Sequence, residues 1–259
     1  MQLRTSFYFL LLNCFAALLA HAEELTIPSK HVGMVSVLAD FPSGDGPFPA
    51  IVLAPGQGYH MRLPALAEPA KMLVANGVAV FRFNWAYFTA QPKGNPSDDL
   101  AKELQDLQAV LGIARTHPRI LHGSVMVGGK SLGSVVAWQA LEADASLRAG
   151  VFLTPICSRV TKGETVPRSV ADENYPGIAN EARPILFVSG DRDPLCSSTL
   201  LYQFAAKGIS NTRVAVVGGD HSFEEPSLRA QAAEAANGRH IAAVATITSG
   251  FVADVTAKQ

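Results

Sequence analysis

Residues 124–134, Ser-Val-Met-Val-Gly-Gly-Lys-Ser-Leu-Gly-Ser, indicate the fold of the whole chain. The apolar, β-branched run at 124–127 predicts a strand, and residues 132–141 predict a helix. Between them stands Gly129-Lys130-Ser131-Leu132-Gly133, which has the pattern G-x-S-x-G. Between a strand and a helix, this pattern is typical of a strained turn that lifts a serine hydroxyl out of the sheet edge, with glycines that let strand and helix approach.

Two other interpretations of this turn compete with a reactive serine. A phosphate-binding loop needs a glycine five residues before Gly129, where this chain has Ser124, and the intervening residues form a strand rather than a loop. An ordinary tight turn with a helix-capping serine also fits the local sequence. The residues that could activate Ser131 decide between these interpretations.

Outside this stretch, short β-branched runs alternate with stretches of helical period. This alternation predicts an α/β fold with a mostly parallel sheet and helices on both faces, whose functional loops follow the carboxyl ends of the strands. Strands are expected at residues 32–38, 50–54, 78–83, 124–127, 150–153, 185–188 and 214–217, and helices at 69–75, 97–117, 132–141, 198–206 and along the tail to 255.

Composition excludes several classes of protein. The 259 residues carry a formal net charge of −1, with 48% hydrophobic and 17% charged residues. This is an ordinary globular mixture without the basic cluster that a nucleic-acid surface needs. The three cysteines are too few for a disulfide scaffold, and no metal-binding spacing is present. We therefore expect no metal, no cofactor and no nucleic-acid partner.

The first 22 residues resemble a signal peptide. Arg4 precedes an apolar run at residues 7–19, and Ala20-His21-Ala22 has the small-x-small pattern that precedes cleavage. An apolar run of about 13 residues is short for a membrane span, which needs about 20. We predict cleavage after Ala22, a single domain at 23–259 without a membrane span, and a periplasmic or secreted location.

Two later loops supply the partners that a serine nucleophile needs, a base and an acid that orients it. Asp191 and Asp193 follow the strand at 185–188, and His221 follows the strand at 214–217. The order serine, acid, histidine along the chain is the order found with this type of turn. Both aspartates are candidate acids at this point.

With these residues in place, the chain resembles the α/β-hydrolase superfamily over nearly all of residues 45–255. It is most similar to small dienelactone-hydrolase-like members, in particular to the group that includes a testis-expressed protein and a subunit of the NSL chromatin complex. The resemblance implies an α/β-hydrolase fold with a short lid or none. It rests on Ala54-Pro55-Gly56-Gln57-Gly58, Phe81-Arg82-Phe83-Asn84, Gly128-Gly129-Lys130-Ser131-Leu132-Gly133, Gly190-Asp191-Arg192-Asp193-Pro194 and Asp220-His221-Ser222-Phe223.

The resemblance also implies catalytic roles. Ser131 would be the nucleophile, His221 the base and Asp193 the acid, because the family's Gly-x-x-Asp pattern favours Asp193 over Asp191. The implied function is an exported serine hydrolase that cleaves a small-molecule ester or thioester through an acyl-enzyme. The alternatives are a peptidase with the same triad, or a binding protein that kept the fold and lost turnover.

An oxyanion hole would need two backbone N–H groups, one from the residue after the nucleophile and one from the loop after residues 50–54. The first is Leu132. By resemblance the second is Gln57, with Gly58 as the alternative. Pro55 stands where many relatives have histidine.

Further residues could contact substrate. Tyr59 and His60 lie in the loop after residues 50–54, and the polar stretch at 158–183 could form a small lid with Tyr175 as part of its wall. The alternative for this stretch is a solvated loop.

Cys157 and Cys196 each follow the end of an expected strand. In the α/β-hydrolase order these strands are neighbours, about 5 Å apart. A disulfide is therefore sterically allowed and would be favoured by export. The alternative is two buried free thiols.

Overall fold

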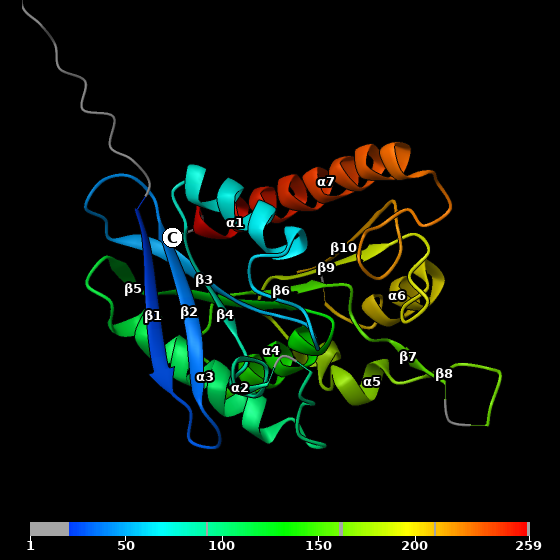
Figure 1. The fold of residues 1–259 in the computed structure, drawn as a ribbon, viewed down its shortest axis with the longest axis horizontal. Helices are drawn as coiled ribbons and strands as arrows, with labels where there is room; N and C mark the ends of the chain where they lie inside the picture. Colours follow the sequence, from blue (N-terminus) through cyan, green and yellow to red (C-terminus); the bar gives the residue numbers. More distant parts are fainter. Residues whose placement is uncertain (1–20, 92, 161–162, 210, 258–259) are drawn as a thin grey trace, which may run out of the picture.

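The computed structural model describes residues 21–91, 93–160, 163–209 and 211–257. Its centre is an eight-stranded sheet in the order β1-β2-β4-β3-β5-β6-β9-β10 (Figure 1). The strands are β1 (His21–Pro28), β2 (Met34–Phe41), β3 (Phe48–Ala54), β4 (Ala79–Asn84), β5 (Ile120–Lys130), β6 (Gly150–Leu153), β9 (Ile185–Gly190) and β10 (Thr212–Val217). The six strands from β4 to β10 in this order are parallel to one another, whereas at one edge β2 pairs antiparallel with both β4 and β1.

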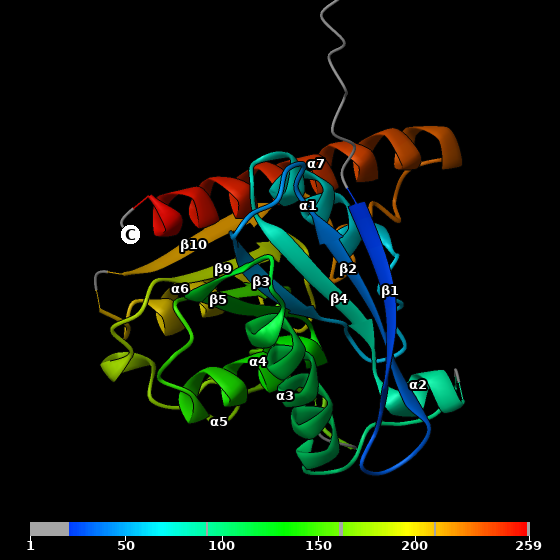
Figure 2. The ribbon, with the colours of Figure 1, turned by 90° about the vertical axis from the view of Figure 1, so that its left-hand side faces the viewer.

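The helices cover both faces of this sheet (Figure 2). They are α1 (Pro64–Ala75), α2 (Ala86–Ala90), α3 (Ala101–Thr116), α4 (Leu132–Ala143), α5 (Ala171–Asn174), α6 (Ser198–Ala205) and α7 (Ala230–Thr256). A short hairpin of β7 (Ser158–Arg159) and β8 (Arg168–Ser169) and a 3₁₀ turn η1 (Ile178–Asn180) lie between β6 and β9. This arrangement confirms the predicted α/β-hydrolase fold.

Side-chain alternation along the strands builds two separate cores. On β3, Val52 belongs to the core formed with α3, α4 and α6. Its neighbours Ile51 and Leu53 point to the opposite face and join the core beneath α1 and α7. Because both faces are buried, the central strands are apolar at successive positions, which is the pattern that parallel sheets require.

The structure differs from the sequence analysis at the amino-terminal side. β1 was not expected, because its start is polar; Leu25 and Ile27 pack against the core, while Thr26 between them is exposed. α1 begins at Pro64 rather than at residue 69, and Pro69 lies inside the helix. Proline has no N–H to donate to the carbonyl four residues earlier, and it is therefore tolerated best in the first turn of a helix. For this reason the sequence analysis placed the start of the helix at Pro69.

Most of the predicted signal peptide, residues 1–20, lies outside the described residues. The predicted cleavage point after Ala22 falls inside β1, where Ala22 pairs with Asp40 of β2. Along the described ranges, no helix combines the length and the apolar character needed to cross a membrane.

Candidate active site

Ser131 occupies a strained turn between β5 and α4. Its backbone has φ 55° and ψ −122°, a conformation that non-glycine residues rarely adopt. The glycines around it are required by contact: a methyl group at Gly129 would collide with the carbonyl oxygen of Gly133, and one at Gly133 would lie 2.5 Å from the carbonyl oxygen of Pro55. The turn therefore packs strand, helix and the loop after β3 against one another around the serine.

Ser131, His221 and Asp193 form a continuous hydrogen-bonded chain. The Ser131 Oγ lies 2.8 Å from His221 Nε2, and His221 Nδ1 lies 2.9 Å from both carboxylate oxygens of Asp193. The Asp193 side chain is fully buried. Its carboxylate also accepts bonds from the Leu195 N–H at 2.8 Å and the Ser189 hydroxyl at 3.2 Å. The aspartate is therefore held in place on several sides and is oriented toward the imidazole.

The structure separates the two candidate acids. Asp191 accepts a hydrogen bond from the Gly219 N–H at 2.9 Å and lies 3.3 Å from the Arg192 guanidinium, with about half of its side chain exposed. It shapes the junction of two loops and does not bond to His221. Asp220, next to the histidine, accepts bonds from the backbone N–H of Ser222 at 2.7 Å and holds the turn.

Lys130 contributes a contact that the sequence analysis did not assign. Only 2% of this residue is exposed. Its Nζ donates a hydrogen bond of 2.9 Å to the backbone oxygen of His221 and lies 4.8 Å from the centre of the Tyr59 ring. Burial lowers the pKa of Lys130 to about 8, although the negative charge of Asp193 and other nearby carboxylates opposes the shift. A lysine inside G-x-S-x-G was the only sequence signal for this role.

The two predicted oxyanion donors come from the start of α4, directly after Ser131, and from the loop after β3. Leu132 is the first residue of α4, where backbone N–H groups have no partner within the helix. Gln57 follows Gly56, and a β-carbon on Gly56 would lie only 3.2 Å from the β-carbon of Ser131. The Trp85 indole N–H donates to the carbonyl of Pro55 at 3.0 Å and steadies this loop. The assignment of Leu132 and Gln57 as donors stays a prediction.

Tyr59 and His60 have different surroundings. The half-buried Tyr59 hydroxyl accepts a hydrogen bond of 3.1 Å from the Ala65 N–H, and burial raises its pKa. His60 Nδ1 accepts from the Arg62 N–H at 3.1 Å, and burial, reinforced by the Arg62 charge, lowers the pKa of its imidazole. Tyr59 lies against the ammonium group of Lys130, the residue before Ser131, whereas no described contact joins His60 to Lys130 or to the triad.

The prediction that Tyr175 lines a substrate cavity is wrong. Its side chain has no exposed surface and lies in the core. Its hydroxyl bonds to Ser134 Oγ at 2.8 Å and accepts from the Ile156 N–H at 2.8 Å, and Ser134 Oγ in turn donates to the Ser131 carbonyl at 2.5 Å. With its polar end satisfied, the ring is free to pack in the interior. It contacts the rings of Trp138, Phe152, Phe187 and Phe204.

The segment that leads to Tyr175 is tied by a disulfide to the loop that carries Asp193. Cys157 and Cys196 form a disulfide with their Cα atoms 4.7 Å apart. The β7–β8 hairpin that follows extends away from the sheet (Figure 1), and Val160 and Val166 in it are exposed. The described part of the predicted lid is thus an outward hairpin that begins beside the disulfide, followed by a segment that packs into the core at Val170, Tyr175 and Ile178.

The comparisons with known proteins agree with this geometry. Residues 48–253 match the family model of the alpha/beta hydrolase domain, and the chain belongs to this family. No curated protein is significantly similar to it in sequence.

In the part of the chain that the structure describes, no group of three or more His, Cys, Asp or Glu side chains is arranged to hold a metal ion.

Several solved structures share the fold. An α/β serine hydrolase homologue from Coxiella burnetii is 19% identical, with 88% of this chain and 95% of that chain covered and a TM-score of 0.65. Est1E from Butyrivibrio proteoclasticus, with ferulic acid bound, is 15% identical over 90% and 99%, with a TM-score of 0.68. Dienelactone hydrolase from Anabaena variabilis is 17% identical over 90% and 96%, with a TM-score of 0.63. The chain thus has the fold of dienelactone-hydrolase-like α/β serine hydrolases, which supports a hydrolase activity.

Proposed function

We propose that the protein is a serine hydrolase that cleaves carboxylic esters or thioesters with Ser131, His221 and Asp193. The observation that carries this proposal is the unbroken hydrogen-bonded chain from the Ser131 hydroxyl through the imidazole to a buried carboxylate. A serine hydroxyl is a weak nucleophile and needs a base to accept its proton, and the base needs an acid to orient it. In this geometry Ser131 is hydrogen-bonded to His221, and His221 is hydrogen-bonded to Asp193.

Acylation uses these contacts in order. His221 Nε2 accepts the proton of Ser131 as Oγ bonds to the acyl carbon, and the electron pair of the carbonyl moves to its oxygen. Asp193 keeps the proton on Nδ1 and stabilises the imidazolium that forms. The backbone N–H groups of Leu132 and Gln57 donate to the oxyanion. The carbon–oxygen or carbon–sulfur bond then breaks as His221 returns its proton to the leaving group.

Deacylation repeats these steps with water. His221 accepts a proton from water, the hydroxide bonds to the acyl carbon, and the bond to Ser131 Oγ breaks as the serine is protonated again. One water is consumed, and a carboxylic acid and an alcohol or thiol are released. The same route would cleave a peptide. A binding protein without turnover is disfavoured, because the charged and strained parts of the triad are all retained.

We also propose that the protein is exported, to the periplasm or outside the cell. The support is the basic start, the apolar run and the Ala20-His21-Ala22 pattern, together with the disulfide, which persists in oxidising compartments. Expression of the full chain tests this: protein recovered from the periplasm should begin at Glu23. Full-length protein confined to the cytoplasm would refute it.

A fluorophosphonate probe tests the catalytic proposal, because such probes bond to activated serines. Wild-type protein should be labelled, and Ser131→Ala should not. Ser146→Ala removes an exposed serine after α4 and serves as the matched control that keeps full labelling. Labelling that survives in Ser131→Ala would place the nucleophile elsewhere.

A further inference from the structure

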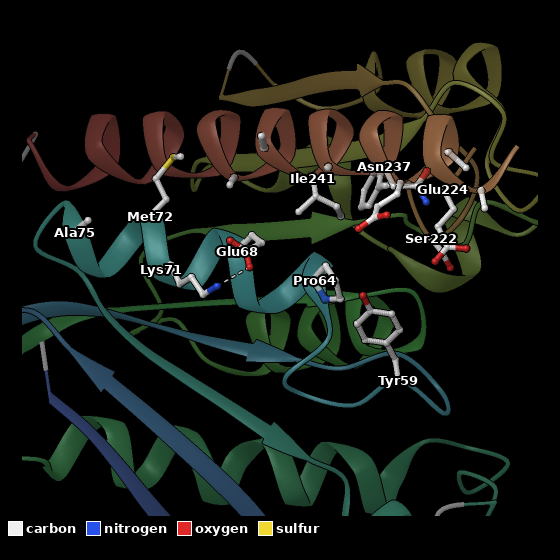
Figure 3. A pocket seen from close by; sticks show the side chains of 17 residues that line it. Tyr59, Pro64, Glu68, Lys71, Met72, Ala75, Ser222, Glu224, Asn237 and Ile241 are labelled. Carbon is white, nitrogen blue, oxygen red and sulfur yellow. Dashed lines mark hydrogen bonds and ion pairs between the residues drawn. The ribbon is translucent and has the colours of Figure 1, made fainter. Parts of the chain in front are cut away.

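An open groove of about 910 Å³ lies between α1 and α7 (Figure 3). Its size is in the range of ligand-binding sites. Pro64, Ala75 and Ala242 are exposed along it, so the groove is open to solvent. Most of its lining is apolar and comes from Pro64, Met72, Ala75, Ala233, Ile241 and Ala242.

One end of the groove adjoins the triad. Tyr59, Ser222 and Glu224 form this end, and Ser222 directly follows His221 (Figure 3). The point where a β-carbon on Gly56 would lie is 3.2 Å from the β-carbon of Ser131 and 3.5 Å from that of Tyr59. The β-carbons of Tyr59 and Ser131 are therefore no further apart than the sum of these two distances, so this end of the groove lies close to Ser131.

The length and the apolar lining of the groove favour a hydrocarbon chain. α1, which forms one wall, has 12 residues. At a rise of 1.5 Å per residue it is about 18 Å long, so a long chain can lie along it. An extended peptide would place part of its backbone against apolar side chains and against helices whose own backbone is already bonded. A hydrocarbon chain has no polar groups that would lose water in this way.

The charges at the rim exclude an anionic occupant. Lys71 pairs with Glu68 at 2.7 Å. Glu224 and Glu234 make no ion pair with any of the described residues, so the charged side chains that line the groove are negative in sum, and the buried Lys130 beneath Tyr59 offsets this only in part. A fatty-acid carboxylate is repelled by such a rim, whereas a neutral alcohol is not.

The chemistry of the triad indicates which part of an ester lies on this side. His221 must give its proton to the leaving oxygen, so the leaving group lies on the histidine side of Ser131. One end of the groove is formed by Ser222, the residue that directly follows His221.

We propose that the groove between α1 and α7 binds the alkyl chain of the leaving alcohol, so that the preferred substrates are esters of long-chain alcohols. This inference rests on the proposed function, in which Ser131 attacks the ester. Water supplies OH to the acyl carbon and H to the alcohol oxygen, and the long-chain alcohol is released from the groove.

Acetate esters of increasing alcohol length test the proposal, because butyl and decyl alcohols are nearly identical as leaving groups. Each methylene that is buried strengthens binding about fourfold. In an open groove only part of the longer chain leaves water. We therefore expect kcat/KM for decyl acetate to exceed that for butyl acetate about tenfold. A p-nitrophenyl ester series of increasing acyl length should show no such rise. A rise along the acyl series, or a flat alcohol series, would overturn the proposal.

Two variants locate the effect in the groove. Ala242→Phe fills the groove from α7 and should bring the decyl-to-butyl ratio of kcat/KM close to one. Ala232→Phe introduces the same side chain at an exposed position of α7 that does not line the groove, and should keep both the activity and the ratio of the wild type. Equal ratios in the two variants would contradict a role for the groove.

A binding measurement separates this inference from the proposed function. Calorimetric titration of Ser131→Ala with decan-1-ol should show binding, and adding Ala242→Phe should weaken it about tenfold, by the same methylene arithmetic. Hydrolysis of butyl acetate without decan-1-ol binding would overturn this inference and leave the hydrolase proposal standing. Binding of decan-1-ol by a wild-type protein that neither cleaves any ester nor accepts the fluorophosphonate would overturn the hydrolase proposal instead.

Discussion

The ammonium group of Lys130 donates a hydrogen bond of 2.9 Å to the backbone oxygen of His221, 91 residues further along the chain. The same group lies over the ring of Tyr59. Lys130 directly precedes Ser131, so one buried cation connects the turn of Ser131, the loop of His221 and the loop after β3. Its contacts explain why a charge is retained at a site where burial disfavours it.

Lys130 should make the stability of the protein depend on alkaline pH. Its pKa is about 8 in the fold and 10.5 when solvated, so between these values the unfolded chain binds a proton that the folded chain has lost. The free energy of unfolding should therefore rise with pH, by about 2 kcal/mol between pH 8 and 9.5. Urea unfolding at both pH values measures this. Lys130→Met should lack this contribution, whereas Lys102→Met, at an exposed position of α3, should retain it. The same rise in Lys130→Met as in the wild type would show that another group titrates.

Asp193→Asn should lower kcat by roughly 10³–10⁴, as the equivalent change does in a measured triad, because an amide no longer holds His221 in the working tautomer. Asp191→Asn is the matched control. It loses a bond to the Gly219 N–H and no contact with the imidazole, so kcat should change far less. Steady-state kinetics with a short p-nitrophenyl ester give both values. Losses of similar size would mean that the two carboxylates have been assigned wrongly.

Gly133→Ala should destabilise the fold, because its methyl group would lie 2.5 Å from the Pro55 carbonyl oxygen and would push α4 away from the loop after β3. Overpacking of this kind costs about 1–3 kcal/mol. In Gly112→Ala, on α3, the new methyl group meets no atom within 4 Å. That variant should gain up to about 1 kcal/mol from helix propensity. Urea unfolding of both variants should give opposite signs; a stable Gly133→Ala would show that the elbow has room to relax.

Replacing both Cys157 and Cys196 by serine opens a loop of 39 residues. Loop-closure entropy predicts a loss of about 4 kcal/mol in the free energy of unfolding. Activity should fall as well, because the Cys157 N–H bonds to the carbonyl of Leu195, whose own N–H holds the Asp193 carboxylate. Urea unfolding and kinetics measure the two effects. Wild-type protein in reductant is the control and should behave like the double variant. Unchanged stability in both samples would show that the disulfide does not stabilise the fold.

The parts of this protein that sequence analysis predicted are governed by atoms close together in the chain. The elbow at Ser131 could be recognised because Gly129 and Gly133 are required by contacts within one turn. The strands could be recognised from local runs of apolar, β-branched residues, and the two buried faces of the sheet follow from side-chain alternation. Resemblance to a family then favoured Asp193 over Asp191, and the structure places Asp193 against His221.

Other features depended on segments that are remote in sequence. Tyr175 looked like a cavity wall because it lies in a polar stretch, yet it packs against rings from α4, β6, β9 and α6. β1 has a polar start, and its strand conformation depends on the register with β2. The contact of Lys130 with His221 likewise forms only after β5 and β10 have taken their places in the sheet.

The sequence by itself therefore determined the fold class, the tight turn at Ser131 and the order of serine, aspartate and histidine along the chain, because backbone sterics and side-chain periodicity act over a few residues. Only the tertiary structure decided which carboxylate meets the imidazole, which polar groups are buried, and that α1 and α7 enclose a groove next to Tyr59. These features depend on packing between segments that can be more than 150 residues apart in the sequence. A local sequence pattern contains no information on the distance between two such side chains.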